Sequence, residues 1–220
     1  MSEEVDKMQK QLSKEEIYAT LNERHSPEIQ AVLSAGNVAI AGLGGLGSNV
    51  AYSLTRIGVG HLHLIDFDKV DISNLNRQQY FTDQLDMYKT DAMKENLARI
   101  APYVEVTCEC MKITEDVIPG LFDDADIICE AFDRPEAKAM LVNGVLCEYP
   151  DKKIVSGSGM AGLDSANKIH TRKVMKNLYL CGDEEADSCM GLSLVSARVL
   201  VCAAHEATMI LRLIAGETEV

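Results

Sequence analysis

The chain of 220 residues is long enough for one α/β domain with a well-filled core, and its composition, 47% hydrophobic and 25% charged, is ordinary for a globular protein. Its formal net charge of −13 argues against non-specific binding to nucleic acid or to an anionic membrane. The polar N-terminus is unlike a secretory signal, and the apolar stretches are too short for a membrane span, so we expect a cytoplasmic protein.

Residues 1–35 are predicted to form a helical segment. Ser13 and Glu16 have the spacing of a capping box, and Ser26 before Pro27 is a typical helix start. After this segment, short apolar runs alternate with stretches whose apolar residues recur at helical spacing. Strands are predicted at 37–42, 61–68, 104–110, 125–132 and 152–159, and helices at 48–58, 89–101, 114–122 and 135–149.

Five alternations of strand and helix are typical of a parallel sheet with helices on both faces. Beyond Gly162 the pattern changes, since residues 166–182 can hold one or two strands and residues 191–215 have the pattern of a long apolar helix. Neither a repeat nor a low-complexity linker divides the chain. We therefore predict a Rossmann-like, doubly wound α/β fold with a mostly parallel sheet, in one domain that spans residues 1–220.

A glycine-rich loop joins the first predicted strand to the helix after it. Gly42, Gly44 and Gly47 have G-x-G-x-x-G spacing, with Gly45 between them, and Asp66 ends the next strand. Such a loop brings backbone amides and a helix N-terminus to a phosphate chain, and a carboxylate at the place of Asp66 accepts hydrogen bonds from a ribose. The loop therefore predicts a nucleotide site. The alternatives are structural glycines and a turn-capping aspartate.

The stretch SNLNRQ and the start of the next helix help to decide which nucleotide is bound. They supply Asn74, Arg77, Gln78 and Lys89, each of which alone is also compatible with a solvated surface residue. A lysine at a helix N-terminus opposes the helix dipole, and a bound anion would relieve that conflict. Together, Arg77 and Lys89 suit a triphosphate better than the pyrophosphate of a dinucleotide.

Asp133 follows the predicted strand 125–132, at the edge where open α/β sheets bind their ligands. Beside a triphosphate its carboxylate would be a natural ligand for Mg²⁺, which is usually held by one or two carboxylates and phosphate oxygens. The alternative is that Asp133 caps the following helix, with Arg134 and Pro135 in its first turn. The residues alone leave both interpretations open.

The seven cysteines include no C-x-x-C pair, so neither a disulfide framework nor a four-cysteine zinc site is expected. Cys129 and Cys202 lie in apolar runs and are predicted core residues. Cys189 lies in an acidic segment, and acidic neighbours raise the pKa of a thiol. A catalytic histidine or Tyr-Lys pair of a dehydrogenase is not evident.

The motifs GLGGLGSN, DFDKVDISNLNRQ and EAFD, with Lys89 before the last of them, occur in an order and spacing that resembles the ThiF/MoeB/HesA family. These adenylyltransferases are relatives of the ubiquitin-activating enzymes, and the compact members of thiamine biosynthesis are the most similar. The second motif is the more specific one, because dinucleotide dehydrogenases lack it. The resemblance covers the chain from about residue 20 to its end. It implies that Mg-ATP adenylylates the C-terminal glycine carboxylate of a ThiS-like sulfur carrier and releases pyrophosphate.

Carried over by motif, the nucleotide-binding residues are Gly42, Gly44, Gly45, Gly47, Asp66, Asn74 and Gln78, and the catalytic residues are Arg24, Arg77, Lys89 and Asp133. Asp66 would hold the ribose, Asn74, Arg77 and Lys89 would contact the phosphates, and Asp133 would bind magnesium. Arg24 would reach the ATP of a partner protomer, so the resemblance implies a homodimer in which residues 1–35 pack on the partner. The small residues of loop 156–162 would leave space for a diglycine tail, and an ordinary turn is the alternative.

The chain departs from the family pattern in its cysteines. Larger members bind zinc through two C-x-x-C pairs that are absent here, so no structural zinc is expected. Cys189 lies where some members have a sulfur-transfer cysteine, Cys181 is a weaker candidate, and a loop cysteine without a role is the alternative. The other functions considered are the same chemistry on another carrier or on a tRNA, an NAD-dependent oxidoreductase, and a non-catalytic scaffold. Neither nucleic acid nor membrane is an expected partner.

Overall fold

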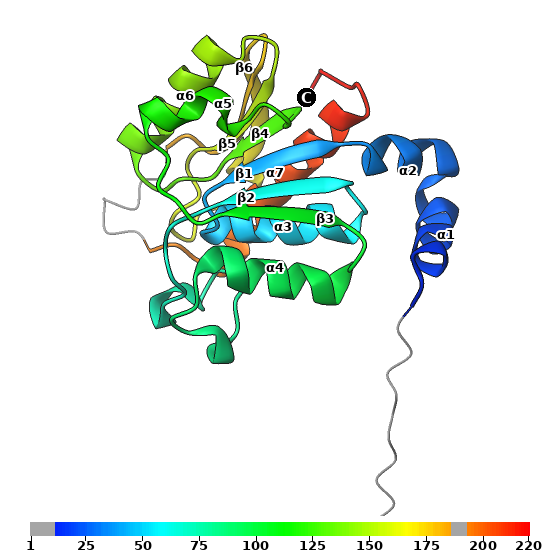
Figure 1. The fold of residues 1–220 in the computed structure, drawn as a ribbon. Helices are drawn as coiled ribbons and strands as arrows, with labels where there is room; N and C mark the ends of the chain where they lie inside the picture. The colour runs from blue at the N-terminus through cyan, green and yellow to red at the C-terminus, as the bar shows by residue number, and fades with distance from the viewer. Residues whose placement is uncertain (1–11, 186–192) are drawn as a thin grey trace, which may run out of the picture.

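One seven-stranded sheet runs through the computed structural model, which describes residues 12–185 and 193–220 (Figure 1). The strands have the order β3-β2-β1-β4-β5-β7-β6, and every neighbouring pair is parallel except β6 and β7. They are β1 (Asn37–Ala41), β2 (His61–Ile65), β3 (Glu105–Glu109), β4 (Ile127–Glu130), β5 (Lys153–Gly157), β6 (His170–Met175) and β7 (Leu178–Gly182). The mostly parallel sheet confirms the predicted Rossmann-like fold class.

The central strands are short apolar runs because both of their faces are covered. All four residues of β4 are buried, and so are all those of β1 except Asn37. Successive side chains point to opposite faces, so Ile40 lies in one hydrophobic core with its cross-strand partner Cys129, and Ala39 lies in the other with Ile128. The edge strand β3 instead alternates between exposed and half-buried residues.

Helices α3 (Gly45–Arg56), α4 (Lys89–Ile100) and α7 (Ser196–Ile214) cover one face, and α5 (Ile118–Leu121) and α6 (Pro135–Glu148) cover the other (Figure 1). The described residues also contain four short 3₁₀ turns: η1 (Ile72–Asn74), η2 (Thr82–Gln84), η3 (Glu115–Val117) and η4 (Ala166–Lys168). The helix predicted over 191–215 begins only at Ser196. Residues 193–195 are not helical, and residues 191–192 lie outside the described part of the chain.

Helices α1 (Lys14–His25) and α2 (Pro27–Ser34) form an arm at the edge of the sheet where the parallel strands begin, as Figure 1 shows. Both helix starts were predicted correctly. Ser13 and Glu16 close a capping box, and the hydroxyl of Ser26 accepts a hydrogen bond from the amide of Ile29. Within the described residues α1 buries none of its side chains, whereas α2 buries Gln30 and Leu33.

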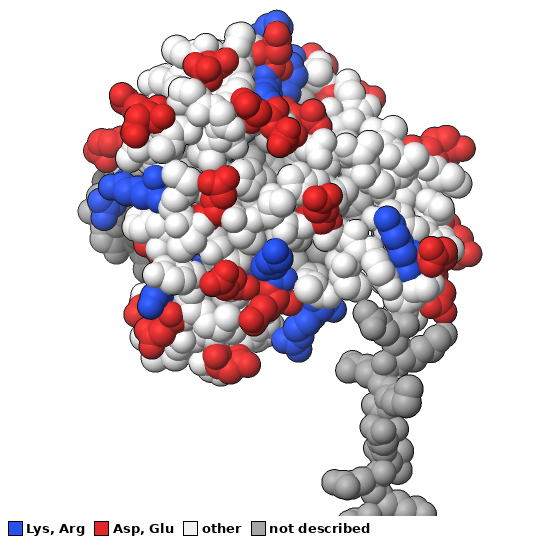
Figure 2. Space-filling model, in the orientation of Figure 1, with Lys and Arg blue, Asp and Glu red and all other residues white. Residues whose placement is uncertain are grey.

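Acidic side chains are spread over the face of the molecule shown in Figure 2, and basic side chains lie among them in separate small groups. A continuous basic stripe of the kind that follows a nucleic-acid backbone is not visible on this face. In the part of the chain that the structure describes, no helix is both long enough and apolar enough to cross a bilayer.

Candidate active site

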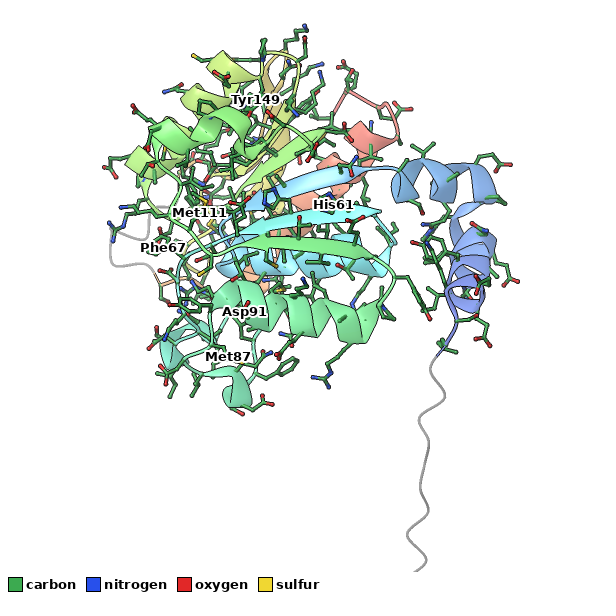
Figure 3. All side chains as sticks on the ribbon, viewed as in Figure 1. His61, Phe67, Met87, Asp91, Met111 and Tyr149 are labelled. Carbon is green, nitrogen blue, oxygen red and sulfur yellow. The ribbon has the colours of Figure 1, made fainter. Side chains whose placement is uncertain are left out.

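The predicted site residues follow strands that all end at the same edge of the sheet. In Figure 3, His61 marks the beginning of β2, and Phe67, which comes directly after Asp66, lies at the opposite end. The glycine loop follows β1 and Asp133 follows β4, both parallel neighbours in the sheet, so these groups lie at that end too. This is the edge where open α/β sheets bind ligands.

The glycine loop brings the N-terminus of α3 close to the end of β1. Gly42 has a φ of +95°, which L side chains rarely adopt, and a Cβ on Gly47 would overlap the carbonyl oxygen of Gly42. Gly44 is the N-cap of α3, and no described side chain accepts a hydrogen bond from the first amides of the helix. These amides, with the positive end of the helix dipole, are therefore available to phosphate oxygens.

Asp66 is held by the loop that it faces. One carboxylate oxygen accepts a 2.6 Å hydrogen bond from the amide of Leu43, and the other accepts a 2.7 Å bond from the amide of Asp68. Burial raises the pKa of Asp66, and the nearby Lys89 opposes that shift. The carboxylate is fixed beside the glycine loop and keeps acceptor capacity for a ribose hydroxyl.

Helix α3 also anchors the segment that carries Arg77 and Gln78. The side-chain amide of Asn49 donates to the carbonyl of Arg77 at 3.2 Å, and its oxygen accepts from the side chain of Gln79 at 2.5 Å. Asn74 makes a local contact, because its side-chain oxygen accepts from the amide of Asp71 and so closes the start of η1. The structure thus brings this segment to the glycine loop, and it uses Asn74 to shape the turn.

Arg77 and Gln78 leave polar atoms unpaired next to the glycines. A Cβ on Gly45 would lie 3.6 Å from Cγ of Arg77, and one on Gly44 would lie 3.9 Å from Nε2 of Gln78. Within the described residues, Nε of Arg77 and Oε1 of Gln78 are buried and have no hydrogen-bond partner. Buried polar atoms are nearly always satisfied, so these two indicate a polar ligand in the space above the loop.

Lys89 is the first residue of α4, and its side chain is only 6% exposed. Its ammonium group lies 3.0 Å from the half-exposed carboxylate of Asp68. The conflict between a lysine and the helix dipole is thus relieved by Asp68 in this structure, a partner that was not foreseen. A phosphate would have to replace or join that carboxylate to contact Lys89.

Asp133 is exposed at the end of β4, directly after the loop residues that line Gly42. The interpretation of Asp133 as a helix cap is wrong, because Arg134 is the N-cap of α6 and forms no side-chain cap bond within the described chain. Among residues 12–185 and 193–220, no three His, Cys, Asp or Glu side chains are grouped to hold a metal. A single carboxylate still fits Mg²⁺ that is bound mainly by phosphate oxygens.

The sequence did not predict the buried ion pair between Glu130 and Lys138, next to the turn that carries Asp133. The fully buried carboxylate of Glu130 accepts hydrogen bonds from Lys138 of α6 at 2.8 and 3.0 Å and from the hydroxyl of Ser156 at 2.5 Å. It also accepts from the amide of Phe132, whose carbonyl in turn accepts from Lys138. The pair fixes the turn that presents Asp133. A charged residue within the apolar run ADIICEAF was the only sign of it.

Two predicted residues are not at this site within the chain. Arg24 is exposed on α1, in the arm at the other edge of the sheet. Cys181 lies inside β7, where burial raises the pKa of its thiol to about 12, so it is not poised as a nucleophile. Cys189 lies outside the described residues.

The chain is similar in sequence to proteins that are named adenylyltransferases. The chain is 34% identical over 133 residues to the adenylyltransferase and sulfurtransferase UBA4 of Scheffersomyces stipitis, over 60% of this chain and 29% of that protein. It is 33% identical over 132 residues to the molybdopterin-synthase adenylyltransferase of Haemophilus influenzae, over 60% of this chain and 54% of that protein. The match therefore spans less than two thirds of the length of either relative.

Among solved structures, the chain is similar to the E. coli tRNA N6-threonylcarbamoyladenosine dehydratase TcdA in complex with ATP. The TM-score is 0.83 at 19% identity, and the match covers 92% of this chain and 95% of that one. At this identity the likeness shows a shared fold. A family model supplies the assignment, because it matches almost the whole described chain, residues 18–220, and on that basis the protein belongs to the ThiF family.

Proposed function

We propose that this protein is an ATP-dependent adenylyltransferase that activates the C-terminal glycine carboxylate of a ThiS-like sulfur carrier in thiamine biosynthesis. The observation that carries the proposal is the pair of unpartnered polar atoms, Nε of Arg77 and Oε1 of Gln78, beside the open N-terminus of α3. Family membership and the names of the adenylyltransferase relatives support the same reaction.

In this proposal each part of the site has a separate task. The amides of the glycine loop and α3 hold the phosphates, and Asp66 accepts a hydrogen bond from the ribose. Arg77 and Lys89 neutralise the charge that develops as pyrophosphate leaves. Asp133 would hold Mg²⁺, which adds positive charge at the phosphate oxygens when it is bound.

The reaction asks for alignment more than for covalent chemistry from the protein. A carboxylate oxygen of the carrier's terminal glycine attacks the α-phosphorus, and the bond from that phosphorus to the bridging oxygen of the β-phosphate breaks. Pyrophosphate leaves with the bonding electrons, and the carrier is left as an acyl-adenylate. The carrier's tail would reach the phosphate along segment 156–162, which begins with the last two residues of β5 and continues into the loop at the same edge of the sheet.

We extend the proposal to a homodimer in which residues 1–35 of one protomer pack on the other and supply Arg24 to its site. This segment is suited to that role because Leu12, just before α1, and Ile29 and Val32 of α2 are exposed. Arg24 itself is exposed and lies at the edge of the sheet away from its own glycine loop. Residues 1–220 would then work as one ATP-binding domain.

The direct test is intact-mass analysis of a ThiS-like carrier after incubation with the protein and Mg-ATP, together with pyrophosphate release. An AMP adduct that disappears when the carrier's terminal glycine is deleted would support both the reaction and the substrate class. Arg77→Ala and Asp133→Ala should abolish the adduct without loss of the fold. Wild-type rates in both variants would contradict the proposed site.

Other outcomes of the same assay select among the alternatives. ATP binding without an adduct on the ThiS-like carrier would point to a molybdopterin-synthase-like carrier or a tRNA. The net charge of −13 disfavours the tRNA. Binding of NADH in place of ATP would favour an oxidoreductase. Binding of the carrier without any turnover would favour a scaffold.

A further inference from the structure

Arg198, in the first turn of α7, is an arginine buried at the edge of the sheet that carries the nucleotide site. Its Nη2 donates to a carboxylate oxygen of Asp183 at 2.5 Å, and the two side chains are 5% and 2% exposed. Its Nη1 donates to the backbone carbonyl of Ala161. Charges removed from water need close partners, because their desolvation is costly. The pair therefore fastens α7 to the end of β7 and to the loop after β5.

The segment held in this way is loop 158–162. The amide of Asp183 donates to the carbonyl of Gly159 at 2.9 Å, and the amide of Glu184 donates to the carbonyl of Ser158 at 3.0 Å. Gly159 has a φ of +80°, and a Cβ there would overlap the carboxylate of Asp183. The loop thus lies directly on the ion pair, and its conformation depends on where Asp183 is held.

The same end of α7 contacts the nucleotide site. A Cβ on Gly45 would lie 3.0 Å from Cγ1 of Val199 and 3.6 Å from Cγ of Arg77, so both side chains lie beside Gly45 at the start of α3. The side-chain amide of Asn76 donates to the carbonyl of Leu194, just before the helix, at 3.4 Å. One turn of helix therefore packs against the phosphate-binding segment and also holds loop 158–162.

We propose that Arg198 is a positioning residue that sets loop 158–162 in register with Arg77, so that a carboxylate tail lying along the loop reaches the α-phosphate. This inference rests on the proposed function. Binding of ATP needs only the glycine loop and Arg77, whereas attack by the tail also needs loop 158–162 at the correct position relative to them. Loss of the ion pair is therefore expected to lower carrier-dependent turnover while ATP affinity is kept.

The test compares the wild-type protein with Arg198→Lys and with the double variant Arg198→Met/Asp183→Leu. Removal of both charges leaves no uncompensated charge from this pair, so the double variant is expected to fold. The matched control is Arg172→Met. It removes the exposed ion pair between Arg172 and Glu184, the residue directly after Asp183. Circular dichroism and Tm report on the fold, calorimetry gives the Kd for ATP, and pyrophosphate release gives kcat and KM for the carrier.

We expect the double variant to lose roughly 100-fold in kcat for carrier adenylation, since a misplacement of about 1 Å can cost that much. Its Kd for ATP should stay within about threefold of wild type. Arg198→Lys should keep part of the rate because it retains a positive charge next to Asp183. Arg172→Met should behave like wild type.

Full kcat and KM in a folded double variant would overturn the inference, and so would a loss of ATP affinity as large as the loss of turnover. If the double variant does not fold, Arg198→Lys decides, since its kcat should fall at constant ATP affinity. Absence of any carrier adduct with the wild-type protein would instead refute the proposed function before a variant is made.

Discussion

Glu206 of α7 offers a sharp prediction about stability. Its side chain is fully buried next to β5, where a Cβ on Gly157 would lie 2.9 Å from Oε1 of Glu206. Within the described residues neither carboxylate oxygen has a hydrogen-bond partner. Burial raises the pKa of Glu206 well above its usual range, although Lys138 opposes that shift. Burial therefore favours the protonated, neutral form of this carboxyl group.

The size of the effect follows from these contacts. A buried polar group without partners costs about 1–3 kcal/mol, so Glu206→Met should raise the free energy of unfolding by about that amount. For a protein of this size the corresponding increase in Tm is about 2–12 °C. Glu206→Gln isolates ionisation, because it keeps the shape of the side chain but cannot lose a proton.

The pH dependence of the free energy of unfolding provides a separate test of this prediction. The unfolded chain releases the proton of Glu206 above its ordinary pKa of 4.5, whereas the folded protein keeps it. Unfolding thus releases a proton, and the wild-type protein should lose stability relative to Glu206→Gln as pH rises from 4.5 towards the raised pKa. Urea denaturation at about pH 5 and about pH 8 measures this difference. Parallel pH profiles for the two proteins would refute the reasoning.

Three further predictions concern the site. Gly47→Ala should weaken ATP binding about tenfold or more, because its Cβ would displace the loop from α3, and an unchanged Kd by calorimetry would contradict this account. Lys138→Met leaves the carboxylate of Glu130 without its charged partner and should cost about 2–4 kcal/mol in urea denaturation, whereas a cost below about 1 kcal/mol would show that the pair is dispensable. Asn49→Ala removes the anchor of the Arg77 segment, so the Kd for ATP should rise about tenfold with the fold retained, and wild-type affinity would count against a preorganised Arg77.

Local patterns in the sequence predicted the elements whose causes are local. The caps of α1 and α2, the alternating strands and the glycine loop all depend on residues within a few positions of one another. The convergence of the glycine loop and Asp66 was also predictable, because parallel strands end at one edge.

Contacts between distant residues were not predictable in this way. Arg198 meets Asp183 only because α7 returns across the sheet, and neither residue carries a local sign of the pairing. Lys89 was expected to need a bound anion, but Asp68, in the loop after β2, supplies the negative charge. Asp133 could not be separated from a helix cap until the start of α6 was known.

The pairing of Lys89 with Asp68 has a consequence for discrimination among anions. The carboxylate acts as an internal competitor, since any small anion that reaches the buried ammonium group must compete with a partner already at 3.0 Å. A lone inorganic phosphate exchanges one negative neighbour for another and gains little. A chain of phosphates would also contact the amides of α3 and the guanidinium group of Arg77. These additional contacts would more than compensate for the loss of the contact between Lys89 and Asp68. We therefore expect this site to bind a polyphosphate in preference to a single phosphate ion.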